Sequence, residues 1–72
     1  MKDKALKKTV DIVIQKLTER RKKLGYSHQK VADLSGLNRS AISLIESRKR
    51  EPTLFTLLRI ADALEIDIKS LF

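Results

Sequence analysis

Apolar residues recur at helical spacing through the first third of the chain. Between Lys4 and Leu24, spacings of three and four separate the apolar positions Leu6, Val10, Val13, Ile14 and Leu17. This spacing is typical of an amphipathic helix. Gly25 follows a basic last turn, where a left-handed C-cap is favoured. The pattern therefore predicts a first helix over residues 4–24. It leaves open whether the lysine-rich start, including residues 1–4, is a disordered arm or an extension of that helix.

Caps and breaks predict three further helices and a last helical turn. The second helix ends near Leu34 and the third near Ser47, and the only proline precedes the fourth. Small polar residues that favour the N-cap position begin the four elements at Ser27, Asn38, Thr53 and Asp67. No alternating run is long enough to argue for a strand. We expect one all-α domain over residues 1–72 with five helices.

The same periodicity predicts which apolar side chains form the core. The two short helices between Ser27 and Ser47 would bury one apolar side, comprising Val31, Leu34, Leu37, Ile42 and Ile45. The fourth helix would bury Leu54, Leu57, Leu58, Ala61 and Leu64.

Composition narrows the class of protein. With 72 residues and no cysteine, the domain has neither disulfides nor thiolate metal ligands to stabilise it. The absence of cysteine fits a cytoplasmic protein. The N-terminus lacks the pattern of a secretory signal, and no apolar run is long enough to span a bilayer. With only one histidine and no glycine-rich phosphate loop, we expect no enzymatic activity, no bound metal and no cofactor.

The positive charge is unevenly distributed. Of the formal net charge of +7, all the excess lies in residues 1–30, which hold ten Lys or Arg against three acids. Residues 31–72 hold six of each. Such a basic region suits a polyanion such as nucleic acid, although a solvated lysine-rich helix would have the same composition.

Residues 27–47 have the organisation of a helix-turn-helix motif. Two short helices are joined by a brief turn that contains Gly36. Ala32 suits the point where the helices cross, and glycine suits a turn with a positive backbone angle. In this motif the first helix lies across the DNA backbone and the second enters the major groove. The motif therefore predicts binding to double-stranded DNA.

The stretch from Gly25 to Glu46 resembles the lambda-repressor-like helix-turn-helix family, of Cro and xenobiotic-response-element type. The family's fourth helix is matched by Pro52-Thr53 and by residues 57–64. Residues 32–43 look especially like the small controller proteins of restriction-modification systems. The resemblance covers roughly residues 10–72 and implies a transcriptional regulator. It also implies that the side chains that contact bases are those of Asn38, Arg39, Ser40, Ser43 and Leu44.

The chemistry of these residue types agrees with that role. In the first turn of a helix in the major groove, Arg39 can donate two hydrogen bonds to O6 and N7 of guanine. Ser40 can bond a base or a phosphate, and Leu44 can touch a thymine methyl group. The alternative is that Arg39 and Ser40 are ordinary solvated residues at a helix start.

Other polar residues are candidates for phosphate contacts and for a structural ion pair. His28 stands where the family usually has glutamine, with Gln29 one place later, so it is either a phosphate ligand or an exposed histidine without a contact. The basic loop before Pro52 is expected beside the DNA backbone. The residues expected at phosphates are Ser27, His28, Gln29, Arg48, Lys49 and Arg50. The resemblance also implies an ion pair between Arg21 and Glu46 that joins the first and third helices.

Apolar residues near the C-terminus suggest self-association. Phe55 lies at a position of the fourth helix where the family usually has a charged residue. One recognition helix contacts few base pairs, whereas two copies one DNA turn apart would bind a near-palindromic site. We expect a homodimer whose interface includes Phe55, Leu58, Ile66 and Phe72. The alternative function is an antitoxin or prophage accessory protein, whose apolar C-terminal face would bind a partner protein. RNA binding is disfavoured because aromatic residues are few.

Overall fold

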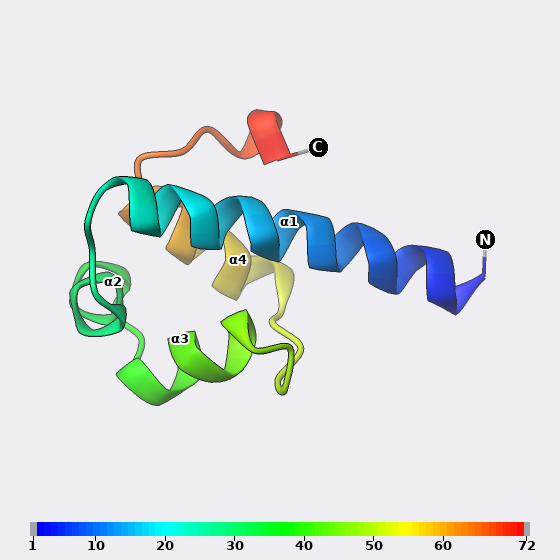
Figure 1. Cartoon of the computed structure of the whole chain (residues 1–72), viewed down its shortest axis with the longest axis horizontal. Helices are drawn as coiled ribbons and strands as arrows, with labels where there is room; N and C mark the ends of the chain where they lie inside the picture. The colour runs from blue at the N-terminus through cyan, green and yellow to red at the C-terminus, as the bar shows by residue number, and fades with distance from the viewer. Residues whose placement is uncertain (1, 72) are drawn as a thin grey trace.

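The computed structural model describes residues 2–71, which form four α-helices and one short 3₁₀ helix (Figure 1). These elements are α1 (Asp3–Lys23), α2 (His28–Ser35), α3 (Arg39–Glu46), α4 (Leu54–Ala63) and η1 (Ile68–Leu71). No strand occurs within residues 2–71. The all-α prediction is confirmed, but the prediction of five α-helices is wrong. The last element is only four residues long, and its backbone adopts the tighter 3₁₀ turn that often ends a helical domain.

Helix α1 includes the lysine-rich start of the chain. It begins at Asp3, so that the described part of this start is helical from that residue on. All residues from Lys2 to Thr9 are exposed, and Figure 1 shows these turns projecting past the other helices. At the other end, Gly25 adopts φ +74°. The N–H of Tyr26 then donates to the Arg21 carbonyl at 3.0 Å, which closes the helix as expected.

Side-chain caps define the helix-turn-helix. Ser27 Oγ accepts from the N–H of Lys30 at 3.0 Å to begin α2, and Asn38 Oδ1 accepts from the N–H of Ala41 at 2.7 Å to begin α3. Between them Gly36 has φ +75°, the left-handed conformation that glycine adopts without strain. These local interactions set the lengths of α2 and α3, and their apolar sides then pack on α1 and α4.

The core lies where the four helices meet. Its largest fully buried side chains are those of Ile42, Leu64 and Val31, and α1 contributes Ile14 and Leu17. Ile60 of α4, absent from the predicted apolar face, is also buried. Among residues 2–71, no helix is long and apolar enough to cross a membrane.

Four residues of the predicted apolar faces are exposed in the structure. Periodicity alone gives too wide an apolar face, because the neighbouring helices cover only part of each helix. The side chains that are exposed instead are Leu6 (48%), Leu34 (48%), Leu54 (63%) and Leu58 (38%).

Arg59 of α4 braces the turn of the helix-turn-helix. Its Nε donates to the Ser35 carbonyl at 2.9 Å, and its guanidinium lies 5.6 Å from the centre of the Phe55 ring. A β-carbon built on Gly36 would lie 2.5 Å from Nη2 of Arg59. Gly36 therefore supplies both a left-handed backbone and the space that Arg59 occupies.

We expect Gly36→Ala to destabilise the fold more than Gly25→Ala. Both substitutions place alanine at positive φ, at a cost of about 1–2 kcal/mol. Nothing lies within 4 Å of a β-carbon at Gly25, whereas at Gly36 the Arg59 guanidinium must move. Weakening its hydrogen bond adds about 1 kcal/mol. Urea denaturation of the two variants measures the difference, and equal losses would show that Arg59 relocates without weakening its contacts.

Candidate nucleic-acid interface

Helix α3 presents a polar surface to solvent. Arg39, Ser40 and Ser43 are exposed and Leu44 is half-buried, and together they line a shallow depression of about 320 Å³. Spacings of three and four place them on one side of the helix, while Ala41, Ile42 and Ile45 on the other side are buried. Four of the five expected base-contacting side chains are therefore gathered on one accessible face.

Arg39 has the chemistry for base recognition. Its side chain lies in the first turn of α3, and its guanidinium forms no hydrogen bond or ion pair within residues 2–71. The fork of N–H donors is thus available for two acceptors on one guanine edge. Ser40 and Ser43 add hydroxyl groups that can donate or accept.

Asn38 differs from the other expected base-contacting residues. Its Oδ1 is the cap acceptor of α3, so this oxygen serves the helix. The NH₂ group of the side chain and the second lone pair of Oδ1 remain for a base. The main role of Asn38 in the structure is therefore to cap the start of α3.

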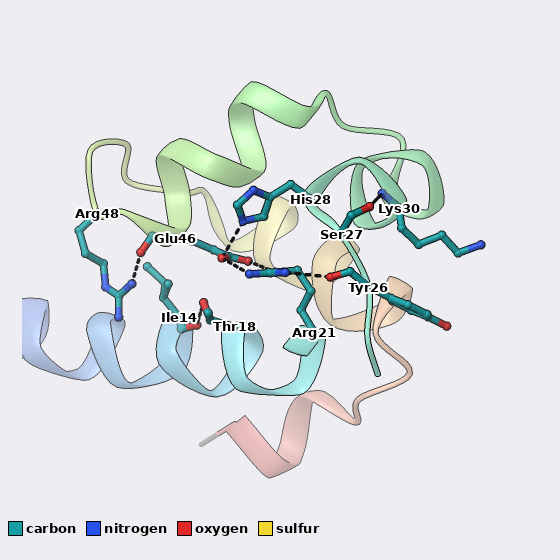
Figure 2. A network of polar contacts seen from close by, with 9 residues as sticks. All are labelled: Ile14, Thr18, Arg21, Tyr26, Ser27, His28, Lys30, Glu46 and Arg48. Carbon is teal, nitrogen blue, oxygen red and sulfur yellow. Dashed lines mark hydrogen bonds and ion pairs between the residues drawn. The ribbon is translucent and has the colours of Figure 1, made fainter. Parts of the chain in front are cut away.

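The orientation of α3 is held by an ion pair at its C-terminal end. Arg21 donates to both carboxylate oxygens of Glu46, from Nε at 2.7 Å and from Nη2 at 2.9 Å. A third bond, from Nη1 at 2.8 Å, reaches the carbonyl of Tyr26 (Figure 2). The two side chains are only 13% and 17% exposed. One guanidinium therefore joins α1, α3 and the segment that leads into α2.

His28 is directed into this network and not toward solvent. Its Nε2 lies 3.0 Å from Glu46 Oε1, and an ionised carboxylate can only accept, so Nε2 carries the proton (Figure 2). The interpretation as an exposed histidine without a contact is therefore wrong, whereas a phosphate contact of His28 stays a prediction. His28 connects α2 to α3.

The network controls the ionisation of Glu46. Burial raises the pKa of this carboxyl, but the hydrogen bonds and positive charge of Arg21, together with the bond from His28, lower it further than burial raises it. The net pKa lies below the ordinary value of 4.5. Glu46 is thus ionised at neutral pH.

The basic loop after α3 is less uniform than its sequence suggests. Arg48 adopts φ +65°, and its guanidinium bonds the carbonyls of Glu46 and Asp11 and pairs with Asp11 Oδ1 at 3.3 Å. The side chain of Arg48 therefore ties the loop to α1, and its contact with phosphate stays a prediction. Lys49 and Arg50 are exposed. The partner Asp11 was missed because it lies 37 positions away in sequence.

At the start of α2, two of the expected phosphate ligands also have internal partners. Ser27 Oγ caps the helix, and Gln29 Nε2 donates to Asp33 Oδ1 at 2.8 Å. Both side chains are exposed, so the end of α2 is accessible to solvent. The polar groups of both side chains are nevertheless already hydrogen-bonded within the protein.

An apolar patch lies on the surface of α4. Phe55 is 68% exposed, Leu54 63% and Leu58 38%, whereas Ile66 is half-buried and packs against the core. Phe72, the other expected interface residue, lies outside the described residues. Leu54 extends the patch, although the sequence pattern assigned it to the core. Within residues 2–71, no three metal-ligating side chains gather.

Comparison with known proteins identifies this arrangement. A helix-turn-helix family model matches residues 17–71. The fold is similar to a point mutant of the restriction-modification controller protein C.Esp1396I, with a TM-score of 0.83 and 30% identity over 89% of this chain and 83% of that chain. It is also similar to the controller protein C.AhdI from Aeromonas hydrophila, with a TM-score of 0.78 and 36% identity over 88% of this chain and 96% of that one. No curated protein matches the chain.

We expect Glu46→Gln to reduce the free energy of unfolding at pH 7 by about 1–3 kcal/mol, because it leaves the Arg21 guanidinium without its carboxylate. Since folding lowers the pKa of Glu46, its stabilisation is present above the ordinary value of 4.5 and is lost as pH falls through the lower folded value. Urea titrations at pH 7 and at a series of pH values below 4.5 should therefore show a difference between wild type and variant that shrinks as the pH falls. A difference that persists unchanged in acid would mean that shape, not charge, accounts for the effect.

Proposed function

This chain belongs to the XRE-type helix-turn-helix family of DNA-binding transcriptional regulators, and on that premise we propose that it acts as a homodimer on a near-palindromic operator. The third helix, α3, enters the major groove in this proposal. The observation that carries it is the exposed face formed by Arg39, Ser40, Ser43 and Leu44, opposite a buried apolar side. Regulation of this kind needs no catalytic group, and we propose no enzymatic activity.

Phosphate contacts follow from the exposed groups on either side of α3. Lys49 and Arg50 supply positive charge that binds phosphates whatever the base sequence, and Gln29 is exposed in the first turn of α2. Contacts of this kind set the register of the protein on the duplex. Arg39 and the serine hydroxyls then discriminate between sequences.

Dimerisation is supported by the apolar patch of α4. Three neighbouring large side chains (Leu54, Phe55 and Leu58) are exposed on a domain of 72 residues that buries a small core. Because such a cluster is costly in water, a second copy of the same patch is a natural cover. Ile66 and Phe72 complete the proposed interface.

The likeness to two controller proteins refines the biological role. Both similar structures are of restriction-modification controllers, and we propose that this chain likewise controls a restriction-modification system. Its place of action would be the cytoplasm, with the DNA that it regulates. A partner-binding antitoxin is the alternative that the first experiment separates.

The function is tested by fluorescence anisotropy on two labelled duplexes at about 150 mM salt, where non-specific binding is weak. One duplex carries the DNA directly upstream of the protein's own gene, and the other carries the same bases shuffled. We expect about 1000-fold preference or more for the upstream duplex. Equal weak binding to both, together with a tight complex with the product of a neighbouring gene, would favour the antitoxin interpretation.

In the same assay Arg39→Ala should weaken binding to the upstream duplex by about 1–3 kcal/mol and binding to the shuffled duplex much less, because the lost bonds are to a base edge. The matched control is Arg50→Ala, which removes an exposed arginine of the loop and should weaken both complexes equally. Equal losses for Arg39→Ala on the two duplexes would mean that Arg39 contacts only phosphate.

Phe55→Glu should shift the dimer toward monomer, because it places a charge in the centre of the apolar patch. Sedimentation equilibrium over a range of concentrations measures the change, and circular dichroism checks that helix content is kept. Ile12→Glu is the control, since Ile12 is an exposed apolar residue of α1 outside the patch. An unchanged dimer in Phe55→Glu would place the interface elsewhere.

A further inference from the structure

The projecting end of α1 carries a one-sided row of lysines. Lys4, Lys7, Lys8 and Asp11 follow the spacing i, i+3, i+4, i+7, which places them on one face of a helix. All four are exposed, and residues 3–11 are continuously helical. We call Lys4, Lys7 and Lys8 the lysine stripe. None of these lysines pairs with an acid within residues 2–71, so the core fold makes no use of their charge.

The contact of Asp11 shows which way the lysine stripe faces. Asp11 pairs with Arg48 of the loop that follows α3, so the face of α1 that carries the stripe is turned toward that loop. A surface groove of about 370 Å³ runs between them, and its polar lining residues are Lys7, Asp11, Arg48, Lys49, Arg50 and Glu51. In Figure 1 the blue end of α1 continues past this loop, on the side of the molecule away from α2.

The charges in and beside the groove favour an anion. Four cations line it against Asp11 and Glu51, and the pairing of Arg48 with Asp11 leaves Lys7, Lys49 and Arg50 against Glu51 alone. Lys4 and Lys8 add two cations directly beside Lys7. The positive surface of the loop therefore continues along α1.

We propose that the lysine stripe is a second phosphate-binding surface for the DNA whose bases α3 contacts. The stripe and the Arg48–Arg50 loop form one continuous basic surface, which binds backbone phosphates beyond those that the loop reaches. The proposal rests on the DNA-binding function proposed above. Lysine ammonium groups suit this role because they act as mobile point charges that need no particular base sequence.

Double-stranded DNA fits this surface better than other polyanions do. Residues 2–23 contain no aromatic side chain on which an unpaired base could stack. The surface is continuous with the loop beside the recognition helix. The Asp11–Arg48 pair also holds α1 and the loop together before DNA arrives.

The test compares the full chain with two triple variants. Lys4→Gln, Lys7→Gln and Lys8→Gln together remove the lysine stripe. Lys16→Gln, Lys23→Gln and Lys69→Gln remove the same charge elsewhere: Lys16 and Lys23 lie on the side of α1 opposite Ile14, and Lys69 belongs to η1. Glutamine matches lysine in helix propensity, so both variants should keep their helices, which circular dichroism checks.

The readout is the dependence of DNA affinity on salt. Each phosphate contact contributes about 0.9 to the slope of log K against log salt, so loss of the stripe should lower the slope by about 2–3. Affinity should fall by a similar factor on the upstream and shuffled duplexes, leaving their ratio unchanged. The control variant should change the slope by less than the contribution of one phosphate contact.

A scan of the upstream duplex with single methylphosphonate linkages locates the contacts. For a group of phosphates, neutralisation should weaken binding of the wild-type protein. Neutralising the same phosphates should leave binding of the stripe variant unchanged. Slopes that fall equally in both triple variants, or identical phosphate profiles for wild type and the stripe variant, would overturn the proposal. If DNA binding is unaffected while binding to anionic vesicles or single-stranded RNA is lost, the stripe serves that other polyanion and the proposal is likewise wrong. Absence of sequence preference in wild type would instead count against the proposed function.

Discussion

The buried carboxylate of Glu46 is the interaction on which the orientation of the recognition helix depends. It accepts bonds from Arg21 of α1 and His28 of α2 while it belongs to the last turn of α3. Three helices are thus joined at one ionised group that is mostly removed from water (Figure 2). A short helix of eight residues has little stability of its own, so its direction is set by such contacts and by its apolar side.

The same network separates the polar residues of the chain into two groups. Arg21, His28 and Arg48 have their side chains engaged with other parts of the protein, whereas Arg39 and Lys49 project into solvent. Groups of the first kind hold the angle between helices, and only those of the second kind are available to a ligand without breaking a bond. A count of basic residues does not make this distinction.

Two surfaces of different character result from the packing. The polar face of α3 and the adjoining basic loop and lysine stripe are suited to a polyanion, whereas the patch of Leu54, Phe55 and Leu58 on α4 is suited to an apolar partner. Arg59 lies beside Phe55 and also braces the turn between α2 and α3. The side chain of Arg59 therefore contacts both the turn of the helix-turn-helix and the proposed dimer surface.

The sequence by itself determined the elements of this fold, because caps and turn residues act locally. Ser27, Asn38 and Gly36 each perform the function expected from residue type and spacing, and the helix-turn-helix follows from them. Only the tertiary structure decided which polar and apolar groups meet. Leu34 and Leu54 are exposed because no helix covers them, and the partners of His28 and Arg48 lie 18 and 37 positions away. Contacts of that range depend on how helices pack, and helical periodicity carries no information about which neighbour will cover a given face.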